Sequence, residues 1–330
     1  MAHGAGGKAT NTLVEGLFVP AFPSETLTDL ADAAVLDIEG AALAMTTDAF
    51  VVKPLRFPGG SIGELAVNGT VNDLAAGGAR PVALTAAFIL EEGLDSGTLV
   101  AEVQAMADAA RAAGVNVAAG DTKVVERGKA DGMYIVTTGL GVRDAQVRLS
   151  PQRVRPGDQI LCSGFVGDHG TAIMLARGEL ELDADIVSDT APLTEAAQAL
   201  LRTGGEGVHA MRDPTRGGVA TVLNEIAAGA GVGVVLDEGS VPVRPTVTGA
   251  CEILGIDPMY VANEGVLLAF VAPEVADDAL ASLLATPAGR DAAVIGEVDE
   301  EPAGMVLVRT AFGGTRIMDM LIGDPLPRIC

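Results

Sequence analysis

The chain has 330 residues, a formal net charge of −23 at pH 7, 3% aromatic residues and no tryptophan. A strongly acidic surface repels nucleic-acid phosphates, and scarce aromatic residues offer few faces on which bases could stack. No apolar run approaches the roughly 20 residues that span a membrane, and the first residues lack the apolar stretch of a signal peptide. We therefore expect a cytoplasmic protein with neither nucleic acid nor membrane as a partner.

Strand-like and helix-like segments alternate along the chain, which predicts a mixed α/β (α+β) fold. Ser61 and Glu64 have the spacing of a capping box, which would begin a helix that ends at Gly77 and Gly78. In chain order, the first half is predicted to contain a strand at 43–52, a helix at 61–76, a strand at 82–90, a helix at 97–113, and strands at 115–119 and 133–140.

A polar stretch with prolines, residues 150–157, predicts a boundary between two domains. Beyond it we expect one helix that begins at 167–170, one at about 192–203, and one with Asp213 as N-cap and Pro214 as first residue. Strands are predicted at 159–163, 232–236, 266–271, 292–297 and 305–309. The domains would comprise residues 1–150 and 151–322, followed by a tail at 323–330.

Three aspartates, Asp48, Asp73 and Asp121, are predicted where a strand or helix meets a loop, each beside Thr or Asn oxygens. A carboxylate at the end of an apolar segment is costly unless it has a partner. Mg²⁺ is a suitable partner for several carboxylates and usually comes with substrate phosphates. Each residue alone could be a turn or cap residue, but the three together favour a metal–nucleotide site.

Two further segments could carry chemistry. The glycine-rich stretch 3–8 is only loosely similar to a phosphate-binding loop, because it lacks the P-loop spacing, and it could equally be an unstructured terminus. Glu264 lies at the entrance of a predicted strand, where it is either a turn residue or a general base.

The chain ends in Cys330, carried on a tail with prolines at 325 and 327. Proline lowers the entropy that a tail loses on docking, so the terminal thiol could visit more than one site. Cys162 and Cys251 lie in apolar stretches and should be buried. Three cysteines are too few for a disulfide framework, which suggests a reducing compartment.

Nine segments, taken together and in this order, resemble the HypE family of hydrogenase maturation proteins, which are carbamoyl-cysteine dehydratases. The resemblance covers essentially the whole chain, and the terminal PRIC distinguishes this family from the wider aminoimidazole ribonucleotide synthetase-like superfamily of ATP-dependent enzymes. The segments are 3–7 (HGAGG), 46–48 (TTD), 57–60 (FPGG), 65–74 (LAVNGTVNDL), 119–125 (AGDTKVV), 167–170 (GDHG), 213–218 (DPTRGG), 262–265 (ANEG) and 327–330 (PRIC).

The resemblance implies a two-domain fold, with an N-terminal domain that binds ATP and pairs into a homodimer, a C-terminal α/β domain and a mobile tail. It implies that Asp48, Asp73 and Asp121 hold Mg²⁺ and the ATP phosphates. It also implies a wider ATP-binding set of Asp48, Asn68, Asp73, Asp121, Gly6 and Gly7.

The implied reaction is the ATP-dependent dehydration of a carbamoyl group on Cys330 to a thiocyanate. Lys123 and Glu264 would lie near that group, and the resemblance leaves open which of them takes the proton. The implied partners are the carbamoyltransferase HypF, which loads Cys330, and the HypC–HypD iron scaffold, which receives cyanide. The alternatives are another small-molecule enzyme of the superfamily and a non-enzymatic thiol carrier switched by nucleotide.

Overall fold

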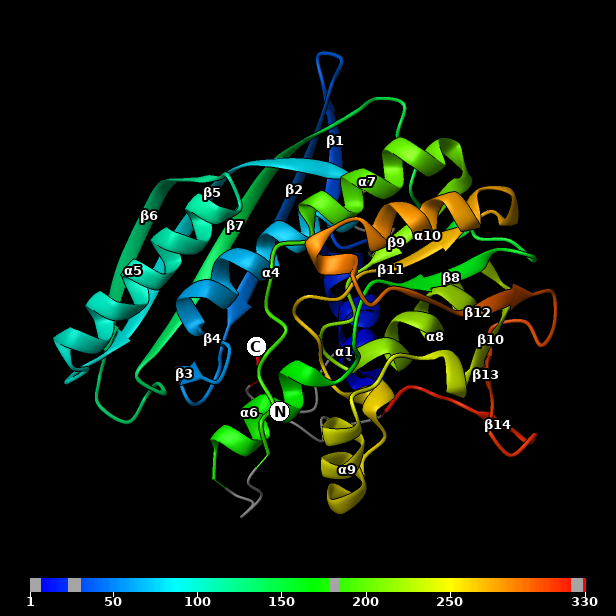
Figure 1. Cartoon of the computed structure of the whole chain (residues 1–330). Helices are drawn as coiled ribbons and strands as arrows, with labels where there is room; N and C mark the ends of the chain where they lie inside the picture. Colours follow the sequence, from blue (N-terminus) through cyan, green and yellow to red (C-terminus); the bar gives the residue numbers. More distant parts are fainter. Residues whose placement is uncertain (1–6, 23–30, 179–183, 322–328) are drawn as a thin grey trace.

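The computed structural model describes residues 7–22, 31–178, 184–321 and 329–330. A five-stranded sheet has the order β1-β2-β7-β5-β6 (Figure 1). Its strands are β1 (Ala34–Ile38), β2 (Ala41–Phe50), β5 (Ala79–Glu91), β6 (Asn116–Val125) and β7 (Met133–Arg143). A short hairpin of β3 (Arg56–Phe57) and β4 (Gly60–Ser61) follows β2 in the chain. Among the described residues, no helix is long and apolar enough to cross a membrane.

A second, seven-stranded sheet has the order β14-β13-β10-β12-β8-β11-β9. Its strands are β8 (Gln159–Cys162), β9 (Val208–Arg212), β10 (Gly233–Asp237), β11 (Leu268–Val271), β12 (Ala293–Asp299), β13 (Val306–Arg309) and β14 (Thr315–Ile317). Helix α8 (Gly218–Ala230) covers one face, and α7 (Thr194–Gly204) with α10 (Ala276–Leu284) covers the other (Figure 1). Since both faces are buried, strands such as β11 are apolar throughout.

Helix α4 (Ile62–Ala76) is the central element between the sheets (Figure 1). It packs on the five-stranded sheet, on α5 (Ser96–Ala112) and on α7, so 13 of its 15 residues are buried. Small residues allow this close packing: a Cβ on Gly63 would lie 2.2 Å from the carbonyl oxygen of Glu102 on α5. The buried polar residues of α4 are therefore held in fixed positions.

The remaining helices lie around these layers. They are α1 (Lys8–Leu13) and α2 (Val19–Ala21), separated by a π-helical turn, followed by α6 (Asp168–Ala176) and α9 (Pro245–Leu254), with short 3₁₀ turns elsewhere. Helices α6 and α9 contact each other.

One face of the five-stranded sheet carries exposed apolar side chains. Helices α4 and α5 cover the opposite face (Figure 1). Met45 is aligned with Leu140, and Leu36 is aligned through Leu43 with Val142, so these side chains share a face. We call this surface the open face; its large residues, between 37% and 50% exposed, are Leu36, Ile38, Met45, Leu140 and Val142.

The predicted elements are largely confirmed, with three differences in detail. Ser61 is the N-cap of α4, but its hydroxyl makes no capping hydrogen bond, so the predicted capping box is wrong. Strand β6 continues to Val125, so Asp121 lies inside a strand and not at its end. Helix α8 begins at Gly218, five residues after Asp213, so Asp213 is not its N-cap.

The late start of α8 has a steric cause. Gly217 and Gly218 both have positive φ, 76° and 62°, and a Cβ on Gly218 would lie 2.5 Å from the carbonyl oxygen of Met259. The chain therefore makes a tight turn here before the helix can form, and this turn leaves the Asp213 carboxylate available for other contacts. Gly6 and residues 323–328 of the predicted tail lie outside the described residues. The division into domains at residue 150 stays a prediction.

Candidate active site between the two sheets

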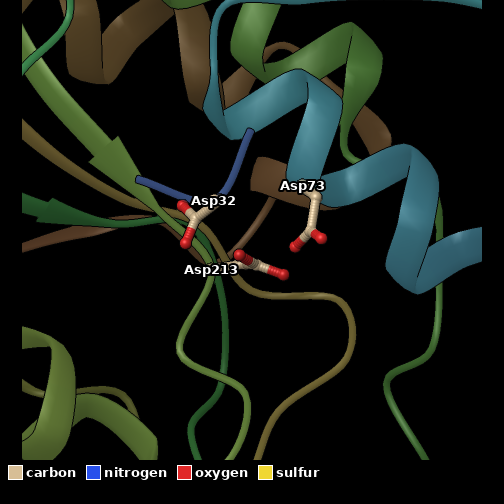
Figure 2. A group of neighbouring side chains, drawn as sticks. All are labelled: Asp32, Asp73 and Asp213. Atoms are coloured by element: carbon tan, nitrogen blue, oxygen red, sulfur yellow. The ribbon is translucent and has the colours of Figure 1, made fainter. Parts of the chain in front are cut away.

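Three aspartates converge between the two sheets (Figure 2). Asp32 precedes β1, Asp73 is on α4, and Asp213 follows β9. One carboxylate oxygen from each lies within 4.8 Å of the others. We call these three residues the acidic cluster.

Burial and mutual repulsion disfavour ionisation of the three carboxyl groups in the acidic cluster. Burial raises the pKa of Asp32 to about 6 and, with the neighbouring Asp32 charge, that of Asp213 to about 8. The pKa of Asp73 is raised well above its ordinary value by burial and by the charge of Asp213. Arg212 supplies one positive charge, with its Nε 2.6 Å from Asp32 Oδ1 and its Nη2 2.9 Å from Glu225.

A divalent cation fits the acidic cluster. The donors are all carboxylate oxygens, which Mg²⁺ prefers, and one of them, Asp32 Oδ2, is buried without a hydrogen-bond partner. A bound cation would let all three carboxylates ionise together. The residues present therefore match the ligand chemistry of Mg²⁺.

A second charged group adjoins the acidic cluster and contains Asp48, Arg216 and Glu264. Arg216 Nη2 lies 3.9 Å from Asp48 Oδ1. Glu264 is 3% exposed, and burial together with the charges of Asp48 and Asp213 raises its pKa well above the ordinary value, while Arg216 lowers it. This carboxyl group thus holds its proton to higher pH than a solvent-exposed one.

The backbone of Glu264 is fixed on two sides. Its amide N–H donates to the Asp189 carboxylate at 3.1 Å, and the N–H of Gly265 donates to the same carboxylate at 3.1 Å. Its carbonyl oxygen accepts from Asn72 Nδ2 on α4 at 3.1 Å. Burial raises the pKa of Asp189 to about 7. These bonds connect the segment that precedes β11 to α4.

The end of the chain enters this site. The Cys330 backbone oxygen accepts a hydrogen bond from the Val51 N–H at 3.1 Å, just after β2. The negative charge of Cys330 is the largest cause of a raised pKa at Arg216. Cys330 is partly buried, whereas Cys162 and Cys251 are buried free thiols as predicted. The inward position of Cys330, which the sequence left open, is the one the structure has.

Asp121 and Lys123 lie away from the acidic cluster. Both are exposed on β6, and Lys123 Nζ pairs with Asp121 Oδ2 at 2.8 Å. The strand register aligns Asp48 through β7 and β5 with Gly120, three strand spacings or about 14 Å away. The side chain of Asp121 also points to the opposite face from Asp48. Within one chain, therefore, neither residue joins the acidic cluster.

The other predicted ATP-binding residues have mixed outcomes. Asn68 Nδ2 donates to Thr190 Oγ1 at 3.1 Å, and its buried Oδ1 has no hydrogen-bond partner. Gly7 is the N-cap of α1 and packs against Leu321, whose carbonyl oxygen would lie 2.3 Å from a Cβ at this position. No described contact connects Gly7 with the acidic cluster.

A cavity of about 380 Å³ adjoins the acidic cluster and shares Asp32 with it. Arg143 and Arg148 line this cavity, and the pKa of Arg143 is lowered by burial and by the Arg148 charge. The volume is within the range of small-molecule sites, roughly 300–1,000 Å³. The cavity can therefore hold a small anionic ligand beside the cluster.

Comparisons with known proteins agree with this arrangement. Residues 30–143 match the family model "AIR synthase related protein, N-terminal domain", and residues 155–309 match the corresponding C-terminal domain. The chain is 50% identical over 330 residues to carbamoyl dehydratase HypE of Bradyrhizobium diazoefficiens, covering 100% of this chain and 95% of that protein.

Two crystal structures are similar along nearly the whole chain. One, of a HypE–HypF complex, has a TM-score of 0.89 and 46% identity, covering 94% of this chain and 99% of that one. The other, of the hydrogenase maturation protein HypE with ATP, has a TM-score of 0.85 and 48% identity, covering 99% and 98%. The two-domain fold predicted from sequence is confirmed.

Proposed function

The chain belongs to the HypE family of carbamoyl dehydratases, ATP-dependent enzymes of hydrogenase maturation, and we propose that it converts a carbamoyl group on its own Cys330 into a thiocyanate. The position of Cys330 carries this proposal. Cys330 reaches this site: its backbone oxygen accepts from the Val51 N–H, and its negative charge raises the pKa of Arg216, which the charges of Asp48 and Glu264 also raise. A terminal residue has no structural need for such surroundings, whereas a carrier of the reacting group does.

The reaction requires a better leaving group than an amide oxygen. Transfer of the γ-phosphoryl group of ATP to that oxygen, with loss of one N–H proton, gives ADP and an S-linked imidate phosphate. Loss of the remaining N–H proton and of phosphate then leaves Cys330–S–C≡N. Phosphoryl transfer needs positive charge around the transferred group, and Arg216 supplies one such charge on the described chain.

Asp32, Asp73 and Asp213 would hold Mg²⁺, which supplies the charge neutralisation that phosphoryl transfer requires. Asp48 lies at the rim of this group, where its charge acts on both Asp73 and Glu264. The adjoining cavity, with Arg143 and Arg148 in its lining, is the proposed nucleotide site. Its shared residue, Asp32, would connect the nucleotide with the metal.

Glu264 is the proposed base for the N–H proton. Burial and the neighbouring charges raise the pKa of Glu264 well above its ordinary value, so its carboxylate is a stronger base than a solvent-exposed one. Its main-chain bonds to Asp189 and Asn72 fix the residue beside the site. Lys123 remains the competing candidate, because a second subunit could supply it.

We propose a homodimer that pairs two of the five-stranded sheets. The open face exposes contiguous apolar side chains, as an interface does. In addition, β1 pairs only with residues 41–45 of β2, so the half that carries Asp48 is a sheet edge among the described residues. Strand β6 is the other edge. Bringing these edges together across a two-fold axis would carry Asp121 and Lys123 of one subunit to Asp48 of the other.

The proposed partners follow from the chemistry. A HypE–HypF complex is known for a relative, and we propose that HypF loads the carbamoyl group onto Cys330. The HypC–HypD iron scaffold is the proposed acceptor of cyanide. The three free cysteines agree with a cytoplasmic location, which is part of the proposal.

Intact-protein mass spectrometry tests this function. The chain is incubated with the carbamoyltransferase, carbamoyl phosphate and ATP, and the C-terminal peptide is then mapped. A carbamoyl adduct on Cys330 that loses one water only with Mg²⁺ and ATP supports the dehydratase. An adduct that never loses water would favour the nucleotide-switched carrier. No adduct, under conditions that load a control acceptor, would favour a small-molecule enzyme.

A further inference from the structure

His169 contacts the end of the chain from the first turn of α6. It is fully buried, and both ring nitrogens have partners: Nδ1 lies 2.8 Å from Ser188 Oγ, and Nε2 lies 2.6 Å from the carbonyl oxygen of Ile329. The Phe57 ring and the imidazole form a T-shaped pair with 5.6 Å between centroids. Neither the metal site nor the proton transfer described above uses this residue.

The partners determine which nitrogen carries the proton. A carbonyl oxygen can only accept, so Nε2 donates to Ile329, and Nδ1 accepts from the Ser188 hydroxyl. Ser188 Oγ in turn accepts from the Thr190 N–H at 3.1 Å. Burial lowers the pKa of His169 to about 4, so the ring is neutral and this single tautomer is maintained at neutral pH.

These bonds fix the residue directly before the reacting cysteine. The Ile329 side chain is 4% exposed and packs in the apolar cluster that contains Phe57 and Ile173. The next backbone oxygen, that of Cys330, is held by the Val51 N–H. Two successive oxygens and one buried side chain thus set the register of the terminal dipeptide relative to Arg216.

We propose that His169, oriented by Ser188, is a positioning residue that selects the inward position of the terminal Ile329–Cys330 dipeptide. The inference rests on the proposed function, since Cys330 has to be inside for dehydration and outside for loading. Loss of the Ile329 hydrogen bond should shift the docked-to-undocked ratio by about tenfold, the usual net worth of a buried hydrogen bond.

The test uses two variants of the full chain. His169→Phe keeps a ring but removes the donor, whereas His169→Gln keeps an N–H donor at the same distance along the side chain. Labelling of Cys330 by N-ethylmaleimide, followed on the C-terminal peptide, should be about tenfold faster in His169→Phe and close to the parent rate in His169→Gln. Cys162 and Cys251 are internal controls, because they label only when the chain unfolds. His209→Gln, at a buried histidine bonded to Asp158, should leave Cys330 labelling unchanged.

A second readout separates positioning from a purely structural role. Carbamoyl loading should proceed at the parent rate or faster in His169→Phe, while ATP-dependent dehydration of the loaded chain slows by about tenfold. Parent-like labelling and dehydration in His169→Phe would overturn the inference. If that variant unfolds, Ser188→Ala replaces it, and parent-like behaviour of a folded Ser188→Ala chain would overturn the inference equally. A parent chain that never dehydrates the carbamoyl group would refute the proposed function. The labelling comparison would still test whether His169 holds the terminal dipeptide in the inward position.

Discussion

Asp213→Asn is the substitution that examines the acidic cluster most directly. The side chain is 6% exposed, and burial raises its pKa from 3.8 to about 8 in the folded chain. The pKa of Asp213 is higher in the folded chain than in the unfolded chain. Its contribution to the free energy of unfolding is therefore fully present below about pH 4 and is lost as the pH rises towards 8. The metal-free chain should therefore become less stable across this interval.

The size of the effect follows from the shift. At pH 7, which is about three units above the ordinary pKa of 3.8, the burial of Asp213 lowers the free energy of unfolding. At about 1.4 kcal/mol per pKa unit, this loss is on the order of 4 kcal/mol. Asparagine has nearly the same shape and no charge, so it avoids this cost. At about 2 °C per kcal/mol for a chain of this size, the metal-free variant should melt roughly 8 °C above the parent at pH 7 and at the same temperature near pH 4.

Thermal unfolding with a chelator, and again with Mg²⁺, measures both consequences. Mg²⁺ should stabilise the parent strongly at pH 8 and the variant little, because the variant lacks one anionic ligand. Asp278→Asn, at an exposed position in α10, is the matched control and should change neither result. The reasoning is refuted if Asp213→Asn lowers the melting temperature of the metal-free chain at pH 8, or if Mg²⁺ stabilises variant and parent equally.

Three further predictions concern the base, the dimer and the metal. Glu264→Gln should load a carbamoyl group normally but dehydrate it at least about a hundredfold more slowly; an unchanged single-turnover rate would remove Glu264 from the reaction. Subunits with Lys123→Ala mixed with subunits with Glu264→Gln should recover activity that neither has alone, since one site of the mixed dimer is intact; no recovery would contradict sharing of sites between subunits. Mg²⁺ affinity, measured by calorimetry, should rise from pH 6 to 8.5, because Asp213 and Asp73 must release protons to bind it; affinity independent of pH would argue against these ligands.

The sequence predicts those parts of the site that depend on local pattern. Asp73 is recognisable because it is a carboxylate on an otherwise buried helix of small and apolar residues. Cys330 and Glu264 are recognisable from the terminal motif and from the strand entrance. The helices and strands that the sequence predicts are present, with errors mainly at their ends, but β1, β9, β14 and α10 were not predicted.

The sequence does not predict which carboxylates meet. Asp32 and Asp213 are brought to Asp73 only by the packing of the two sheets. Asp213 has the sequence context of a helix N-cap, and the close approach of Gly218 to Met259 that prevents this role is a tertiary contact. Asp121 resembles Asp48 in its local sequence, but the pairing order of the strands separates the two within one chain. One signal was available for Asp213: a carboxylate directly after the buried strand Val208–Arg212.

The central claim is that ATP activates the carbamoyl oxygen on Cys330. The chain can be loaded with a carbamoyl group whose oxygen is ¹⁸O, supplied with Mg²⁺ and ATP in ordinary water, and the released phosphate analysed by mass spectrometry. We predict one ¹⁸O atom in each phosphate for each thiocyanate formed on Cys330. Phosphate without ¹⁸O, formed together with thiocyanate, would contradict the account, because the oxygen would then have left by a route that does not pass through phosphorylation.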